Sequence, residues 1–152
     1  MVQIGTERPP RLCQLLASPS VRKVFHHAPF DLRFMVAQWS VVPSNVACTK
    51  VASKLLFPDQ PGPQHSLLML LEDHLGVTIS KAQRLTDWLA ADLTPAQLAY
   101  ACGDVEHLLD LLDLLQDKLQ NVGLREDFDA CLRFLPTRVK LELGRWPDVF
   151  GY

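Results

Sequence analysis

The sequence lacks the features that would place the chain in a membrane or in a disulfide-bonded scaffold. It has no run of about 18 apolar residues and no N-terminal basic stretch followed by an apolar core of the signal-peptide type. Its four cysteines, Cys13, Cys48, Cys102 and Cys131, are far apart and form no CxxC pair, so they predict free thiols and no zinc knuckle. We therefore expect a cytoplasmic protein with no membrane partner.

The sequence also lacks an excess of basic residues. Lys and Arg total 15 against 17 Asp and Glu, which gives a formal net charge of -2. Domains that hold nucleic acid by a broad cationic surface are strongly basic, so that mode of binding is disfavoured. An enzyme that grips only a strand end remains compatible, because acidic metal ligands lower the net charge. The 48% hydrophobic composition suffices for one core, and we expect a single domain over residues 1–152.

Strand and helix signals alternate along the chain and predict an α/β domain. Thr94 and Gln97 form a capping box with Pro95 at the first helical position, which predicts a helix continuing to residue 119. Pro136 is expected to end a helix over 128–135. The other expected elements are strands at 2–4, 21–25, 41–42 and 46–48, and helices at 11–17, 30–36, 49–56 (capped by Thr49) and 67–75 (capped by Ser66).

Three residues could carry chemistry. Tyr100 and Asp104 stand four apart in the best-defined helix, so their side chains leave the same face. Asp31 begins a helix directly after the apolar pair 24–25, and ligand sites gather outside the carboxyl ends of strands. The structural alternative is that Asp31 complements a helix dipole, Asp104 is solvated and Tyr100 belongs to the core.

Several ordered stretches resemble one family. Residues 23–32, Lys-Val-Phe-His-His-Ala-Pro-Phe-Asp-Leu, resemble the second exonuclease motif of the ribonuclease D group, and residues 100–105 resemble the third, tyrosine-containing motif. Further similar stretches are Cys48–Leu55, His65–Leu67, Lys81 with Thr86–Trp88, and Phe134–Arg138. The chain is thus similar to the tyrosine-containing subgroup of the DEDD superfamily, and to its short single-domain bacterial members.

This resemblance implies a ribonuclease H-like fold, with a mixed sheet and flanking helices, and hydrolysis of phosphodiester bonds from the 3′ end of RNA. Two Mg²⁺ or Mn²⁺ ions are implied, which suits carboxylate ligands. Asp31 and Asp104 would be the metal ligands. Tyr100 would be the third catalytic residue and would orient the attacking water, since a phenol with a pKa near about 10 is a poor base at neutral pH.

The family's first motif, Asp-x-Glu on an initial strand, has no counterpart in register. Gly5-Thr6-Glu7 imitates it, but Gly5 offers no ligand and Glu7 lies too close to Asp31. We therefore expect an N-terminally truncated domain that lacks its first strand and part of its metal site. Two other functions stay open: a catalytically inactive nucleic-acid-binding or assembly module with the same fold, and a plain α/β interaction domain.

The remaining polar residues permit weaker predictions. His26 and His27 are adjacent on an expected strand and should point to opposite faces, so both should not serve one site. Trp88 is expected to anchor its loop more than to stack on a base. A homodimer is one way in which the chain could bind its substrate more firmly. Basic residues that could contact RNA phosphates, or simply be solvated, are Lys50, Lys54, Lys81, Arg84, Arg138 and Lys140.

Overall fold

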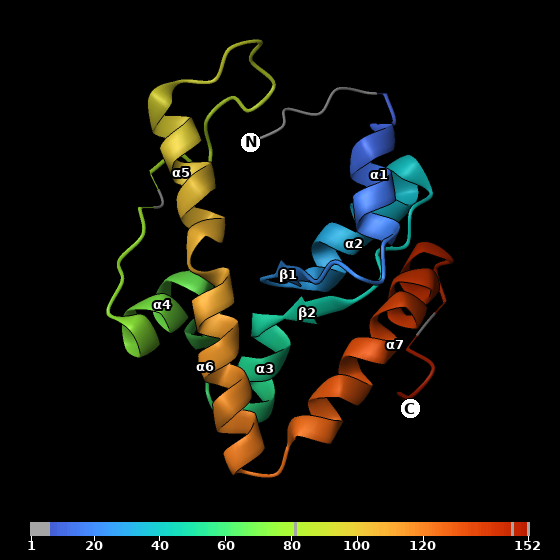
Figure 1. Cartoon of the computed structure of the whole chain (residues 1–152), viewed down its shortest axis with the longest axis vertical. Coiled ribbons are helices and arrows are strands. Elements are labelled where there is room, and N and C mark those ends of the chain that lie inside the picture. Colours follow the sequence, from blue (N-terminus) through green and yellow to red (C-terminus); the bar gives the residue numbers. More distant parts are fainter. Residues whose placement is uncertain (1–6, 81, 147, 152) are drawn as a thin grey trace.

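The computed structural model describes residues 7–80, 82–146 and 148–151, and it has α/β architecture as expected (Figure 1). The strand expected at 2–4 lies outside these ranges. The helices are α1 (Pro10–Ala17), α2 (Ala28–Trp39), α3 (Thr49–Leu56), the 3-10 turn η1 (Gly62–His65), α4 (Leu67–Leu75), α5 (Pro95–Glu106), α6 (Leu108–Asn121) and α7 (Arg125–Leu143). The strands are β1 (Lys23–Phe25) and β2 (Val46–Cys48). Residues 41–42 form no strand, because Pro43 follows them and lacks a ladder N–H.

The two described strands lie parallel, joined by α2. Lys23 is opposite Val46 and Phe25 is opposite Cys48. Parallel strands place their carboxyl ends at the same edge of the sheet. The start of α2 and the start of α3 therefore meet there, and a 2.9 Å hydrogen bond between His26 Nδ1 and the Thr49 hydroxyl joins them.

The leucine run of α6 forms the main core. Leu111, Leu115 and Leu119 are completely buried, and Leu70 of α4 and Phe128 of α7 pack into the same cluster. A second cluster joins α2 to α7. These two clusters fix α2 and α6 relative to β1.

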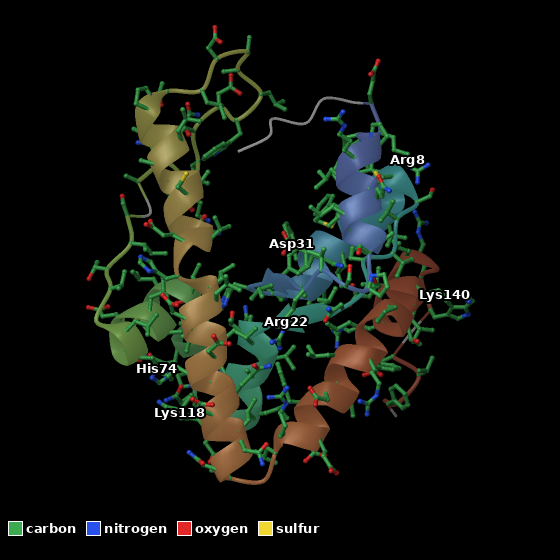
Figure 2. All side chains as sticks on the ribbon, viewed as in Figure 1. Arg8, Arg22, Asp31, His74, Lys118 and Lys140 are labelled. Atoms are coloured by element: carbon green, nitrogen blue, oxygen red, sulfur yellow. The ribbon has the colours of Figure 1, made fainter. Side chains whose placement is uncertain are left out.

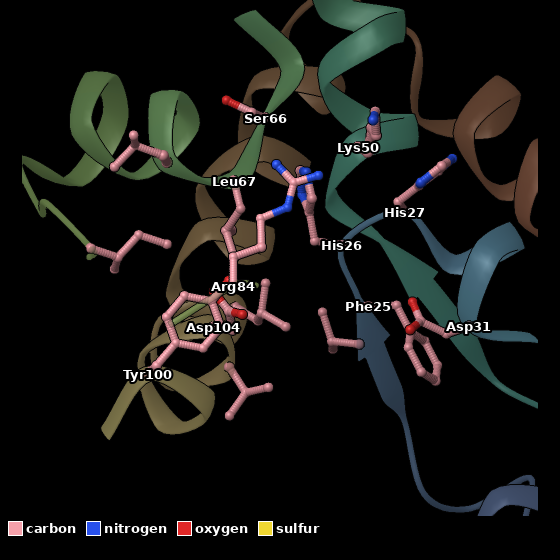
Figure 3. Close-up of a pocket in the computed structure, with 15 residues that line it drawn as sticks. Phe25, His26, His27, Asp31, Lys50, Ser66, Leu67, Arg84, Tyr100 and Asp104 are labelled. Carbon is pink, nitrogen blue, oxygen red and sulfur yellow. The ribbon is translucent and has the colours of Figure 1, made fainter. Parts of the chain in front are cut away.

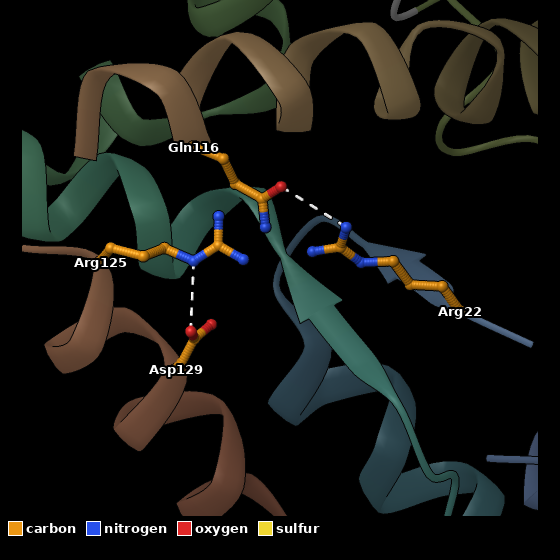
Figure 4. A network of polar contacts seen from close by, with 4 residues as sticks. All are labelled: Arg22, Gln116, Arg125 and Asp129. Atoms are coloured by element: carbon orange, nitrogen blue, oxygen red, sulfur yellow. Dashed lines mark hydrogen bonds and ion pairs between the residues drawn. The ribbon is translucent and has the colours of Figure 1, made fainter. Parts of the chain in front are cut away.

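Polar contacts add to this packing just before β1 and in the first turn of α7. Arg22, directly before β1, donates a long hydrogen bond of 3.4 Å to Gln116 Oε1 on α6 (Figure 4). In the first turn of α7, Arg125 pairs with Asp129 at 3.2 Å, a partly exposed i,i+4 pair. The Arg22 contact links the strand that leads to the candidate site with the core helix.

The helix expected from the capping box to residue 119 is divided in two. α5 ends at Glu106 and α6 begins at Leu108, with His107 between them at φ -104° and ψ 7°. The environments differ on either side of the break: Leu108 starts the buried leucine run, whereas Gln97 is the buried residue of α5. α5 consequently stands away from the core beside the sheet end (Figure 1).

Pro136 does not end its helix, so that prediction is wrong. α7 runs through it to Leu143, and Leu135 and Val139 on either side are buried against α2. Proline removes one backbone hydrogen bond, but burial of its neighbours holds the helix together.

Two expected N-caps are also corrected. The Thr49 side chain makes no capping hydrogen bond, and its hydroxyl instead contacts His26 Nδ1 and the carbonyl of Phe25. Ser66 stands at the N-cap of α4 but makes no side-chain cap bond. Thr49 therefore serves the junction of the two strand ends more than the helix start.

All four cysteines are free: Cys13 and Cys48 are buried, and Cys102 and Cys131 are exposed. Across the described ranges, no helix combines the length and apolarity needed to span a membrane.

Candidate active site

A cavity of about 590 Å³ opens at the carboxyl ends of the strands, and Asp31, Tyr100 and Asp104 all line it. Figure 3 shows Asp31 beside Phe25 on one side, with Tyr100 and Asp104 on the other. The remaining lining residues are Val24, His26, His27, Lys50, Ser66, Leu67, Leu68, Ile79, Arg84, Val105 and Leu108. The fold thus brings the three candidate residues, far apart in sequence, to one cavity.

Asp31 reaches the cavity because the chain turns sharply after β1. His27 adopts a left-handed conformation (φ 70°, ψ 46°) and Pro29 supports the first turn of α2, where Asp31 lies. Burial raises the pKa of the Asp31 carboxyl to about 6, against a smaller lowering by a hydrogen bond from its own backbone. A raised pKa means that the surroundings destabilise the negative charge, which a cation in the cavity would reverse.

Tyr100 and Asp104 form a pair on α5. The Tyr100 hydroxyl donates to the Asp104 carboxylate, and its pKa is raised by burial first and by the Asp104 charge second. The phenol is therefore protonated at neutral pH and can act as a donor. The Trp88 ring packs on it with centroids 5.8 Å apart, while the Trp88 indole N–H donates to the Gln83 carbonyl at 3.1 Å. Trp88 thus anchors its loop, as expected.

Gln97 fixes that loop to the start of α5. The capping box is present: Thr94 accepts from the Gln97 backbone N–H, and Gln97 Oε1 accepts from the Thr94 backbone N–H at 2.9 Å. The other end of the Gln97 amide donates to the Thr86 hydroxyl at 3.1 Å and the Asp87 carbonyl at 2.8 Å. These bonds position the wall that carries Tyr100.

The prediction that His26 and His27 point to opposite faces of a strand, and so do not serve one site, is wrong. Both line the cavity, because β1 ends at Phe25 and His27 has left-handed backbone, so neither follows the strand's period of two. Burial, followed by the Lys50 charge, lowers the pKa of His26 to about 4, and the same two causes lower that of His27. Both rings are neutral at pH 7. Pro29, which favours a helix start just after β1, was the signal available in the sequence.

The basic candidates divide by position. Lys50 and Arg84 line the cavity, and the charges of Lys54 and Arg138 reach His27 closely enough to lower its pKa. Lys140 lies on the outer side of α7, away from Asp31 (Figure 2). Lys81 lies outside the described residues. The cavity therefore combines carboxylates on its walls with cations near its rim.

The donor chemistry suits a hard divalent cation. Within the described residues, no three His, Cys, Asp or Glu side chains are grouped to hold a metal. Asp31 and Asp104 nevertheless offer carboxylate oxygens to one cavity, and carboxylate oxygens are the ligands that Mg²⁺ and Mn²⁺ prefer. The two residues fit as part of a ligand set.

Comparison with known proteins identifies the family. Residues 3–120 match the 3′-5′ exonuclease family. Ribonuclease D of Gluconacetobacter diazotrophicus is 38% identical over 110 residues, which are 72% of this chain and 27% of the relative. The chain belongs to the 3′-5′ exonuclease family, and the expected ribonuclease D resemblance is confirmed. The chain spans only about a quarter of the length of such relatives.

Solved structures agree. Brucella melitensis NrnC is 38% identical with a TM-score of 0.90, covering 97% of this chain and 72% of that one, and it has also been solved with Mg²⁺ and with pGG. Escherichia coli RNase D is 29% identical with a TM-score of 0.73, covering 86% of this chain and 34% of that one. The ribonuclease H-like fold is therefore confirmed. Within the described residues, its sheet consists of the two parallel strands.

Proposed function

We propose that the chain is a metal-dependent 3′-to-5′ exoribonuclease that hydrolyses phosphodiester bonds at the 3′ end of RNA. The observation that carries the proposal is the convergence of Asp31, Tyr100 and Asp104 in one cavity at the strand ends. Membership of the 3′-5′ exonuclease family supports the same reaction.

Each residue has a distinct role in this proposal. Asp31 and Asp104 would hold Mg²⁺ or Mn²⁺, two ions being expected in a complete site. When bound, such ions activate the attacking water and stabilise the leaving oxygen. Tyr100, protonated at neutral pH, orients that water through its hydroxyl. Lys50 and Arg84 provide positive charge for the phosphates of the substrate.

The proposed substrates are short RNA strands with a free 3′ end. Brucella melitensis NrnC bound to pGG is 37% identical with a TM-score of 0.88 and covers 95% of this chain. A cavity of about 590 Å³ has room for a terminal nucleotide and the scissile phosphate, and a longer strand would leave through its rim.

An inactive RNA-binding or assembly module is the second candidate. It is favoured by one observation: the described residues contain no group of three side chains arranged for a metal. This function would keep the fold and the cationic rim while lacking turnover.

The homodimer stays a prediction, and a single monomeric mass by sedimentation at micromolar concentration would contradict it.

The test uses RNA carrying a 5′ label and either a free 3′ hydroxyl or a 3′ phosphate. With Mg²⁺ or Mn²⁺ we expect stepwise shortening of the free-ended strand, slower shortening of the blocked strand, and none in EDTA. Equal cleavage of both strands, or cleavage at internal bonds, would contradict an exonuclease. Binding of the strand without shortening in either metal would favour the inactive module.

A further inference from the structure

A row of exposed rings runs along α2 from the rim of the cavity. The His27 and Phe30 rings are stacked at 17° with centroids 6.3 Å apart, and the Phe30 and Phe34 rings meet edge to face at 5.0 Å. The Arg33 guanidinium carbon lies 5.7 Å from the Phe30 ring centre and 5.4 Å from that of Phe34. Three rings and one cation thus form a continuous surface.

These rings are open to solvent. Phe30 is 50% exposed and Phe34 is 55% exposed, although large aromatic side chains are mostly buried in folded domains. Their spacing of four along the helix holds them on one side. Exposed aromatic faces combined with a guanidinium are the elements with which proteins stack successive bases of a single strand.

The row is continuous with the candidate active site. His27 belongs both to the row and to the cavity lining, and Asp31 follows Phe30 directly in the chain. The charges of Lys50, Lys54 and Arg138 act on the same His27 ring against the single charge of Glu142, so cations outnumber anions there in a chain whose net charge is -2. An anionic, base-carrying ligand matches this combination better than an apolar partner does.

We propose that His27, Phe30, Arg33 and Phe34 form a stacking row for the RNA nucleotides on the 5′ side of the scissile bond. The inference rests on the proposed exoribonuclease function. An enzyme that cleaves at the 3′ end must hold the terminal nucleotide within the cavity, so the strand leaving the cavity runs towards its 5′ end. A dinucleotide would be held by the cavity alone, whereas strands of about four or more nucleotides would reach Phe34.

The test measures binding, in EDTA, of pGG and of a five-nucleotide RNA with 2-aminopurine at the fourth position from the 3′ end. Phe34→Ala should raise the Kd of the pentamer roughly 5- to 150-fold, which is the range expected when one base loses its stacking partner. It should also abolish the quenching of the 2-aminopurine fluorescence. The Kd of pGG should change less than about twofold. Phe34→Trp should restore pentamer binding. The matched control is Phe150→Ala, which removes another exposed ring, 79% exposed, that packs on Phe134.

The outcomes separate this inference from the proposed function. Loss of pentamer affinity in Phe34→Ala alone supports the row, even if the wild-type chain shows no hydrolysis. Equal weakening of pGG and pentamer, or an equal effect of Phe150→Ala, would overturn it while leaving the exonuclease proposal standing. A changed molecular mass of Phe34→Ala with unchanged RNA binding would assign the face to a second copy of the chain. A wild-type chain that binds neither RNA, in EDTA or in Ca²⁺, would overturn both.

Discussion

At the residue scale, Asp31 and His26 face one cavity but respond to burial in opposite ways. The Asp31 pKa rises from 3.8 to about 6, so the folded chain binds this proton more tightly than the unfolded chain, and stability falls as pH rises through that window. The His26 pKa falls from 6.5 to about 4, so the folded chain binds that proton less tightly, and stability falls as pH drops. The two contributions offset each other between pH 4 and 6.

Asp31→Asn removes the contribution of the Asp31 carboxyl to the pH dependence of stability. Without divalent ions, the variant should be more stable than wild type at pH 7.5, by about 1 kcal/mol once solvent screening of this partly exposed group is allowed for. It should then lose stability more steeply towards pH 4.5, because the His26 contribution is no longer offset. Urea unfolding at the two pH values measures both effects. A variant less stable than wild type at pH 7.5 would contradict the assigned environment of Asp31.

Tyr100→Phe tests the role of the hydroxyl in orienting the attacking water. We expect kcat to fall on the order of 10²-fold with little change in KM, because the ring and its Trp88 contact remain. Since the Tyr100 pKa is raised, the wild-type rate should show no ionisation of this phenol below pH 9. Measuring kcat and KM of the wild type and of Tyr100→Phe as a function of pH tests both expectations. Unchanged kcat in the variant would remove Tyr100 from the site.

At the scale of the elements, Gln97 connects the loop over 82–93 to α5. Gln97→Ala removes the partners of the Thr94 backbone N–H and the Asp87 carbonyl, at a cost of about 1–3 kcal/mol to the local structure. Hydrogen exchange should become faster in this loop and in the first turn of α5, and not in α6. Gln120→Ala, an exposed position on α6, is the control. Protection unchanged in both variants would contradict the account.

The elements also show what the sequence could predict. Thr94, Pro95 and Gln97 signal their helix start through contacts within four residues, so local reasoning found it. The break at His107 and the passage of α7 through Pro136 depend on which neighbouring residues the core buries, and that is a tertiary property. The same holds for His26 and His27, whose meeting in one cavity follows from where β1 ends.

The candidate site was predictable only in part for a related reason. Asp31, Tyr100 and Asp104 are proposed from motif resemblance, which is carried by sequence order. The shared cavity, the neutral state of the histidines and the exposed rings of Phe30 and Phe34 come from packing between distant elements. The spacing of four between Tyr100 and Asp104 predicts that they share one face of a helix. It does not predict that Asp31 lies on the opposite wall of the same cavity.

At the scale of the whole molecule, an acidic net charge and a cationic rim predict a weak dependence of RNA affinity on salt. If Lys50, Arg84 and Arg33 each neutralise one phosphate, log K should fall with log salt at a slope of about -2. Fluorescence anisotropy with the five-nucleotide RNA between low and moderate salt would measure it. A slope several times steeper would indicate a broad cationic surface, which the composition disfavours.

The central claim is that the cavity at the strand ends is the site of 3′-to-5′ hydrolysis. The most direct measurement is the initial rate of shortening of 5′-labelled RNA in Mn²⁺ by the wild type, Asp31→Asn, Asp104→Asn and the control Asp110→Asn, whose exposed carboxylate lies on α6 outside the cavity lining. We predict loss of at least about 10²-fold in the two cavity variants, from removal of a metal ligand, and wild-type rates for the control. Shortening that persists in Asp31→Asn and Asp104→Asn, or that is absent from the wild type, would contradict the claim.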